Sequence, residues 1–319
     1  MVKRAIIFGI TGQDGQFLAH SLLTKGYSVL GVSRSAPSEV LFSIESLNNC
    51  DELKIATLNL LDKYELDVLI RAYMPDLIFN LSGITSVAKS FAHPVETFAS
   101  IAMATENILE VIRDINTDIR FLNTGSSECF GESISDMPHI EESIYKPRSP
   151  YATAKVAALY LTDMYRSCYG LRAYSAILSN HESILRKETF FTAKVVSTLR
   201  KIHYGSHAYL TLGNLNVSRD FGWAPDYVEA MIQIVESDNP DNFIVCTGHC
   251  NTLQKFVEKC CNFYGIDMEE CVKTDLSLHR PNEPEKIALC PDKINNIIGW
   301  KAYNTFDDIV EKLCSNTLF

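Results

Sequence analysis

The sequence predicts an α/β protein built on a doubly wound parallel sheet, with a smaller mixed α/β portion towards the C-terminus. Short, nearly continuous apolar runs such as residues 4–10 alternate with segments of helical spacing such as residues 16–26. Such runs are typical of strands buried on both faces, and strand–helix–strand alternation indicates parallel strands joined by right-handed crossovers. The turn between these two segments is rich in glycine, so we expect a Rossmann-like, dinucleotide-binding architecture.

The elements follow one another along the chain. The strand-like runs of the first half are RAIIFGI, YSVLGVS, LKIATLNL, DLIFNLSG and IRFLNTG. The helix-like pieces between them are QFLAHSLLTKG, DKYELDVLIRAYM and VETFASIAMATENILEVIRDI. A long helical stretch follows Pro150, and the strand RAYSAIL comes after it. From about Asn180 the pattern becomes irregular, with the short strand AYLTLG and helices near APDYVEAMIQIVE and TLQKFVEKCCNFYG, so we place a boundary near this residue.

Composition narrows the functional classes. The chain has 319 residues, of which 46% are hydrophobic, and a net charge of -10, which argues against nonspecific nucleic-acid binding. The apolar stretches are too short for a membrane span, and the N-terminal run breaks at a glycine without a cleavage site, so we expect a cytoplasmic protein. Ten scattered cysteines fit reduced core positions, and Cys246, His249 and Cys250 lack a second ligand pair, so no metal is expected.

The glycine-rich turn GITGQDG places Gly9, Gly12 and Gly15 between the first strand and the first helix. Glycines there permit a tight turn and let the backbone approach a pyrophosphate at the helix N-terminus. The second strand ends with Arg34 between two serines, where an acid would select NAD. A cation suits a 2′-phosphate, so NADP is favoured, with NAD possible and a solvated surface arginine as the alternative.

Tyr151 and Lys155 lie four residues apart and therefore on one face of the long helix. A lysine ammonium beside a tyrosine is expected to lower the pKa of the phenol towards the range of a general base. With the glycine turn, this pair resembles the short-chain dehydrogenases/reductases, in the extended branch that acts on nucleotide sugars.

The strand IRFLNTG runs into Ser126 and Glu128, which alternation points to the same side. Hydride transfer needs a hydroxyl, a tyrosine and a lysine, but no added carboxylate. A carboxylate is what proton abstraction next to a ketone requires. The alternative is that the acid only caps the next segment.

The motifs GITGQDG, SSECFG, RSPYATAK, SNHES, SRDFGWAPDYVEA and RPNEPEK together are similar to the GDP-mannose 4,6-dehydratase family, from residue 2 to about Asp308. The resemblance implies a hydro-lyase in which Ser126 takes the place of the catalytic threonine, Glu128 is the acid/base, and Tyr151 and Lys155 are the Tyr–Lys pair. An NADP-dependent reductase or epimerase of the same superfamily, and a non-catalytic NADP-binding regulator, are the alternatives.

The resemblance also implies the remaining site residues, a GDP-sugar substrate and a homo-oligomer, either a dimer or a tetramer. It implies residues 1–179 as mainly the NADP-binding domain and residues 180–319 as mainly the nucleotide-sugar-binding portion, interleaved with the first. The implied cofactor-binding residues are Gly9, Thr11, Gly12, Gln13, Asp14, Gly15, Arg34, Asn59, Leu60, Leu81, Tyr151 and Lys155. The implied substrate-binding residues are Ser86, Ser127, Asn180, Glu182, Lys194, Arg219, Arg280 and Glu283.

The chain departs from the family after NHES, where ILRKETF keeps only Arg186 of a proline, two arginines and a glycine. Paired arginines after the second strand become Arg34 and Ser35, and the usual acid near the adenine becomes Asn59. The sugar therefore stays open between GDP-linked mannose, heptose and N-acetylglucosamine.

Overall fold

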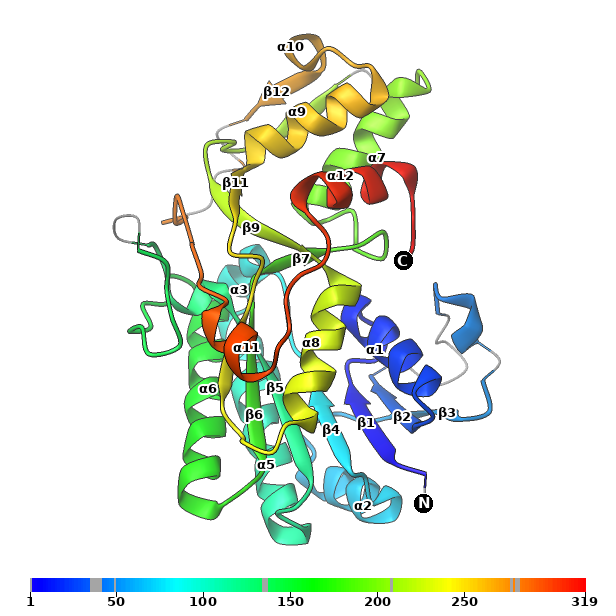
Figure 1. Ribbon diagram of the computed structural model, residues 1–319, viewed down its shortest axis with the longest axis vertical. Coiled ribbons are helices and arrows are strands. Elements are labelled where there is room, and N and C mark those ends of the chain that lie inside the picture. The colour runs from blue at the N-terminus through cyan, green and yellow to red at the C-terminus, as the bar shows by residue number, and fades with distance from the viewer. Residues whose placement is uncertain are drawn as a thin grey trace.

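A seven-stranded sheet forms the centre of the molecule, in the strand order β10-β6-β5-β4-β1-β2-β3 (Figure 1). The computed structural model describes residues 2–34, 42–48, 50–133, 137–206, 209–275, 278 and 282–319. Every neighbouring pair of strands in this sheet is parallel, which confirms the predicted fold class. The strands are β1 (Arg4–Phe8), β2 (Ser28–Ser33), β3 (Leu53–Thr57), β4 (Leu77–Asn80), β5 (Arg120–Ser126), β6 (Ala173–Leu178) and β10 (Asn242–Val245).

Helices cover both faces of the sheet because its strands are apolar on both sides. Ile7 of β1 packs with α1 and α8 on one face, whereas the adjacent Ile6 packs with α2, α5 and α6 on the other. These helices are α1 (Gln13–Thr24), α2 (Lys63–Tyr73), α5 (Ala104–Ile115), α6 (Pro150–Tyr169) and α8 (Ala224–Glu236).

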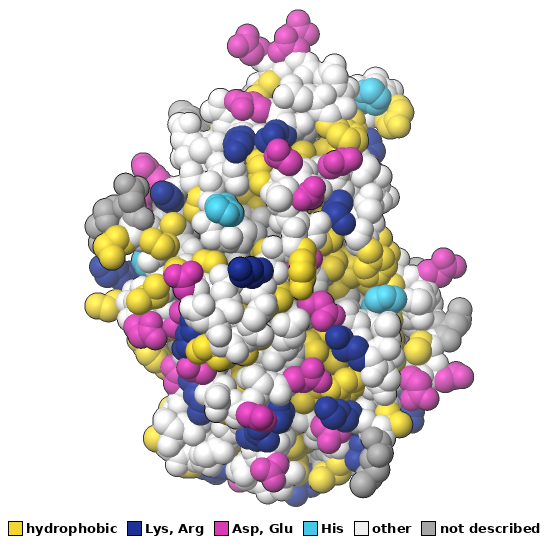
Figure 2. Space-filling model, in the orientation of Figure 1, with side chains coloured by type: hydrophobic (Ala, Val, Ile, Leu, Met, Phe, Trp, Pro, Cys, Tyr) yellow, Lys and Arg dark blue, Asp and Glu magenta, His cyan; other side chains and the backbone are white. Residues whose placement is uncertain are grey.

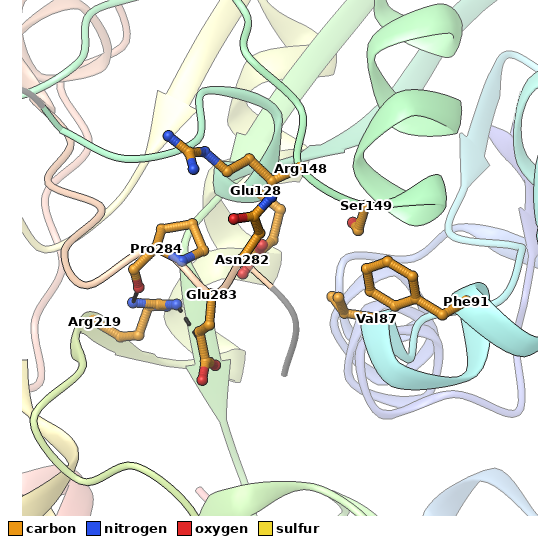
Figure 3. Close-up of a pocket in the computed structure, with 9 residues that line it drawn as sticks. All are labelled: Val87, Phe91, Glu128, Arg148, Ser149, Arg219, Asn282, Glu283 and Pro284. Atoms are coloured by element: carbon orange, nitrogen blue, oxygen red, sulfur yellow. Dashed lines mark hydrogen bonds and ion pairs between the residues drawn. The ribbon is translucent and has the colours of Figure 1, made fainter. Parts of the chain in front are cut away.

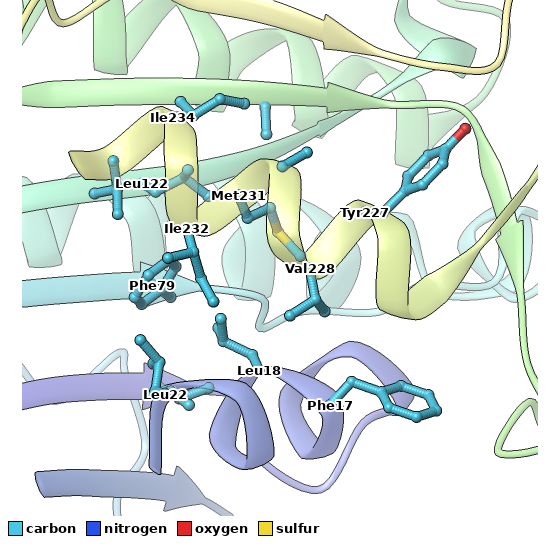
Figure 4. Packing of buried hydrophobic residues seen from close by; sticks show 14 of the residues in the cluster. Phe17, Leu18, Leu22, Phe79, Leu122, Tyr227, Val228, Met231, Ile232 and Ile234 are labelled. Atoms are coloured by element: carbon cyan, nitrogen blue, oxygen red, sulfur yellow. The ribbon is translucent and has the colours of Figure 1, made fainter. Parts of the chain in front are cut away.

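The apolar cluster on the face covered by α1 and α8 is larger than the cluster on the opposite face. Figure 4 shows Leu18 and Leu22 of α1 opposite Val228 and Ile232 of α8, with Phe79 of β4 beside them. All five side chains are completely buried, so α8 is as much a part of this core as α1 is.

The last strand to join the large sheet comes from far along the chain. β10 pairs in parallel with β6, with Asn242 opposite Ser175 and Val245 opposite Leu178. The short helix α11 (Asp292–Ile297) packs against β10. Residues beyond 180 therefore supply both the edge strand β10 and the helix α8, which covers one face of the sheet.

A smaller lobe lies beyond the carboxyl ends of the strands (Figure 1). Its own apolar cluster surrounds Trp223 and joins α7, α9 and α12. The helices are α7 (Phe191–His203), α9 (Leu253–Tyr264), α10 (Met268–Cys271) and α12 (Phe306–Ser315). Two small sheets complete it, from β7 (Asn180–Glu182), β9 (Ser218–Trp223) and β11 (Cys250–Thr252), and from β8 (Leu210–Leu212) and β12 (Val272–Thr274).

The helix expected over residues 95–115 is interrupted. The structure has α3 (Val87–Ala92), α4 (Pro94–Phe98), a π-helical turn over Ala99–Met103 and then α5. Thr97, Ser100 and Thr105 each donate a side-chain hydrogen bond to a carbonyl three or four residues earlier, at 2.7, 3.2 and 2.6 Å. Such bonds compete with the regular helical pattern.

Acidic and basic side chains are interspersed over the face of the molecule in Figure 2. This fits the moderate net charge of -10. Among the described residues, no helix is long and apolar enough to cross a membrane.

Candidate active site

The glycine turn between β1 and α1 depends on the absence of side chains. Gly9 has a φ of +93°, and a Cβ there would lie 2.9 Å from the carbonyl oxygen of Leu81. A Cβ on Gly15 would lie 2.4 Å from the carbonyl oxygen of Gly9. Gly12 is the N-cap of α1 and lies exposed beside Thr11, so no cap side chain covers the helix N-terminus. Such an open N-terminus suits a phosphate group.

Gln13 and Asp14 turn their side chains towards β7. Asp14 Oδ2 lies 3.0 Å from Nε2 of His181, and Gln13 Nε2 donates to the carbonyl oxygen of His181 at 3.2 Å. Ser183 Oγ donates to Gln13 Oε1 at 2.8 Å. His181 has no role that its local sequence predicts, because 167 residues separate it from Asp14.

Tyr151 and Lys155 lie one turn apart in α6, which Ser149 caps by accepting a hydrogen bond from the amide of Ala152 at 3.1 Å. Both side chains are buried. Lys155 Nζ donates to the carbonyl oxygen of Thr124 at 2.6 Å and lies 3.4 Å from its hydroxyl. Burial lowers the pKa of Lys155 to about 8.

The expected lowering of the Tyr151 pKa is wrong for this structure. Burial raises the pKa of Tyr151, and the groups that oppose this effect are the Ser126 hydroxyl and the Arg186 guanidinium. The Lys155 ammonium is itself buried and donates to Thr124. The cost of desolvating a phenolate therefore outweighs the electrostatic benefit of the nearby cations.

The carboxylate of Glu128 is not needed for the turn in which it lies. The 3-10 turn over Ser127–Cys129 is capped by Ser126, whose Oγ accepts a hydrogen bond from the amide of Glu128 at 3.3 Å. The Glu128 side chain instead lines a pocket. The structure therefore does not use this carboxylate as the helix cap that was the alternative reading.

The pocket brings together residues that are far apart in sequence (Figure 3). Arg219, on β9, donates to the carbonyl oxygens of Ser218 and Pro284, both at 2.9 Å, and lies 3.9 Å from Glu283. In Figure 3, Glu128 and Asn282 lie on the opposite side of the pocket from the apolar pair of Val87 and Phe91. The residues that line the pocket are Val87, Phe91, Glu128, Arg148, Ser149, Arg219, Asn282, Glu283 and Pro284.

Two arginines at the site were given no role from the sequence. Arg148 is exposed and lines the pocket directly before the helix that carries Tyr151. Arg186 follows β7, and its charge opposes the rise in the pKa of Tyr151 that burial causes. Arg148 could have been found from its place in RSPY, next to a predicted catalytic residue, whereas the influence of Arg186 depends on the tertiary fold.

Three of the residues implied as substrate-binding are not among those that line this pocket. Ser86 caps α3 by accepting a hydrogen bond from the amide of Lys89 at 3.2 Å. Ser127 is buried, and Asn180 is half-buried at the start of β7.

Two further residues of that group hold the smaller lobe together, and one cannot be placed. The Glu182 carboxylate is buried, accepts a hydrogen bond from Thr192 at 2.5 Å and lies 3.4 Å from Arg186. Lys194 donates to the carbonyl oxygen of Thr211 at 2.7 Å. Arg280 lies outside the described residues, as does Ser35.

The remaining residues implied as cofactor-binding lie near the carboxyl edge of the sheet. Arg34 is exposed immediately after β2. Asn59 is exposed after β3, and its Oδ1 accepts from the amide of Leu61 at 3.2 Å. Leu60 and Leu81 are half-buried and pack against the two apolar clusters on the faces of the sheet.

In the described part of the chain, no group of three or more His, Cys, Asp or Glu side chains could hold a metal ion. Cys250, from the CTGHC segment, donates to the carbonyl oxygen of Ile287 at 3.4 Å.

Comparisons with known proteins place the chain in a family. The model of the GDP-mannose 4,6 dehydratase family matches residues 6–313. GDP-mannose 4,6 dehydratase 1 of Arabidopsis thaliana is 35% identical over 99% of this chain and 90% of its own length. Two solved structures share the fold. The dTDP-glucose 4,6-dehydratase of Bacillus anthracis in complex with NAD has a TM-score of 0.86 and 16% identity, and the match covers 98% of this chain and 96% of that one. The RMD of Pseudomonas aeruginosa complexed with NADPH has a TM-score of 0.81 and 22% identity, and the match covers 99% of this chain and 98% of that one. The chain belongs to the GDP-mannose 4,6-dehydratase family, as its motifs predicted.

Proposed function

We propose that this protein is a GDP-sugar 4,6-dehydratase, a hydro-lyase that forms a 4-keto-6-deoxy sugar nucleotide. The observation that carries the proposal is the placement of Glu128. Its carboxylate lines a pocket shared with Arg219 and Glu283. Its backbone amide donates a hydrogen bond to the Ser126 hydroxyl, and that hydroxyl interacts with the Tyr151 phenol. An added carboxylate beside a hydroxyl and a tyrosine distinguishes elimination from simple hydride transfer.

The residues divide the proton transfers between them. Tyr151 takes the proton of the sugar 4-hydroxyl, and Ser126 hydrogen-bonds the 4-oxygen as charge develops there. Once carbon 4 is a ketone, the proton on carbon 5 is acidic, so Glu128 removes it and assists loss of the 6-hydroxyl as water. Burial raises the pKa of Tyr151, the Ser126 hydroxyl and the Arg186 guanidinium oppose that rise, and Lys155 supplies a second cation to the same buried site.

The nicotinamide cofactor fits the glycine turn, because a Cβ on Gly9 or Gly15 would fill the space that the turn requires. When bound, this cofactor would supply the hydride chemistry, from carbon 4 to the cofactor and back to carbon 6, while a proton returns to carbon 5, so that the net reaction is the loss of water. We favour NADP over NAD because Arg34 stands exposed at the end of β2, where an acid would select NAD. Replacement of Arg34 by alanine should weaken NADPH binding much more than NADH binding in a fluorescence titration, and equal losses would refute the preference.

We also propose that residues 1–179 mainly bind the cofactor and residues 180–319 mainly bind the sugar nucleotide. The glycine turn and the Tyr–Lys pair precede this residue, whereas Arg219, Asn282 and Glu283 follow it. The implied dimer or tetramer and the cytoplasmic location remain predictions. Light scattering coupled to size-exclusion chromatography tests the first.

The proposed function is tested by supplying GDP-mannose, a GDP-heptose and GDP-N-acetylglucosamine separately, with a trace of NADP⁺. A dehydratase yields a product that has lost water without net change in NADPH. In a parallel reaction supplied with NADPH, a reductase consumes NADPH stoichiometrically, which would overturn the proposal.

The role of Glu128 has its own test. Glu128→Gln should keep NADPH and GDP-sugar binding but lose both water elimination and solvent exchange at carbon 5. Glu132→Gln, which changes an acid four residues further along the chain, is the matched control. Full turnover by Glu128→Gln would refute the assigned role.

A further inference from the structure

The first turn of α1 carries an acid where a negatively charged ligand is expected. Asp14 is the second residue of α1, and its carboxylate is mostly buried. A carboxylate near a helix N-terminus stabilises the helix. At this helix, however, it would repel the diphosphate of the cofactor that the proposed function requires, unless another group compensates its charge.

His181 is placed to provide that compensation. Its Nε2 lies 3.0 Å from Asp14 Oδ2, and its Nδ1 lies 2.8 Å from the carbonyl oxygen of Ser179. A carbonyl oxygen and an ionised carboxylate can only accept hydrogen bonds, so both ring nitrogens of His181 must donate. With Asp14 ionised, this geometry corresponds to the imidazolium form.

The electrostatics of the pair agree with this protonation. Burial alone would raise the pKa of Asp14, but the charge of His181 and the hydrogen bonds from His181 and Gln13 outweigh it and lower the pKa to about 2. Burial alone would lower the pKa of His181, but Asp14 raises it above its usual value. Arg186 is a second cation near the pair, and the Asp14 charge also reaches Lys155.

The ring of His181 is held in place by stacking against an aromatic ring from another element. It stacks on the ring of Tyr227, with centroids 4.8 Å apart and an angle of 24° between the planes. Gly222 pairs with His181 in the register of β7 and β9, and a Cβ there would lie 2.1 Å from the Tyr227 ring. The ring orientation therefore depends on a glycine that leaves space for Tyr227.

We propose that His181, held as an imidazolium, neutralises Asp14 so that the first turn of α1 can receive the diphosphate of a nicotinamide cofactor. His181 is on this account a positioning residue, which acts on the cofactor through Asp14. The inference rests on the proposed function, because it requires a cofactor at this turn.

A double-mutant cycle of NADPH binding, followed by fluorescence and calorimetry without substrate, tests the proposal. His181→Gln should weaken binding by roughly 30-fold or more, because it leaves a buried charge without its partner. Asp14→Asn/His181→Gln should recover to within about fivefold of Asp14→Asn, because two sites in contact are not additive. Asp67→Asn, which removes a half-buried carboxylate that pairs with Arg71 on α2, controls for the change in total charge.

The outcomes separate the inference from the function on which it rests. If the double variant binds NADPH as weakly as His181→Gln, the histidine acts on the cofactor directly and the inference is overturned. If the wild-type protein binds neither NADPH nor NADH, the proposed function itself fails. Should His181→Gln not fold, Asp14→Asn alone decides: it should bind NADPH at least as tightly as the wild type, and clearly weaker binding overturns the inference.

Discussion

Replacement of Lys155 by methionine should make the cofactor-free protein more stable at neutral pH. The pKa of this lysine falls from 10.5 to about 8 on folding, chiefly because the ammonium is buried. Each pKa unit corresponds to about 1.4 kcal/mol, so burying the charge costs about 3 kcal/mol. The lost hydrogen bond to the Thr124 carbonyl offsets about 1 kcal/mol, which leaves a net gain of about 2 kcal/mol for the variant.

The gain should depend on pH in a defined direction. Below pH 8 the lysine is protonated in both the folded and the unfolded chain, so the full cost is present. Between pH 8 and 10.5 the folded chain has released the proton and the unfolded chain still holds it, so the wild type becomes more stable as the pH rises. The advantage of the variant should therefore shrink across this window.

Urea unfolding of both proteins at pH 7 and at pH 10 measures the effect. Lys194→Met is the matched control, since Lys194 also donates to a backbone carbonyl but is only half-buried, and it should not gain stability. Lower stability of Lys155→Met than of the wild type at pH 7, or an equal advantage at both pH values, would show that the buried charge does not destabilise the fold. The variant should be inactive in either case, which would make this lysine an example of stability given up for activity.

Two further substitutions test the packing around the site. Gly222→Ala should lower the thermal midpoint far more than Gly205→Ala, because its Cβ would lie 2.1 Å from Tyr227, whereas Gly205 has open space and a φ of +72°, a strain of about 1–2 kcal/mol. Similar midpoints would show that Tyr227 can move aside. Ser149→Ala should lose about 1 kcal/mol in urea unfolding, because it removes the cap of α6, and Ser149→Thr should keep it. Equal losses in both variants would argue against the cap.

The fold was predictable where the signal is local. The apolar runs and the glycine turn each lie within a few residues, so the order of strands β1 to β6 and of helices α1, α2, α5 and α6 follows from them. The pairing of β10 with β6 did not follow, because a four-residue strand is selected by the edge it completes and not by its own composition. The π-helical turn was missed as well, since it depends on side chains that bond back to the helix.

The candidate site, too, was predictable only where the signal is local. Spacing alone put Tyr151 and Lys155 on one helix. The extended alternation expected to point Ser126 and Glu128 to the same side is wrong, because the strand ends at Ser126 and a 3-10 turn over Ser127–Cys129 follows it. The direction of the Tyr151 pKa did not follow from spacing, because burial outweighs the nearby cations and burial is a property of the fold. The pairing of Asp14 with His181 also had no local signal, as it joins two motifs that only the tertiary structure brings together.

The late arrival of α8 and β10 in the sheet has a consequence for synthesis on the ribosome. Phe79 and Leu122 are covered by α8, and β6 lacks its outer neighbour until residue 245 has been translated. A nascent chain that has emerged only through β6 therefore carries an apolar sheet face and an open strand edge, which are the features that favour aggregation and chaperone capture. The folding of this protein is thus tied to completion of most of its chain.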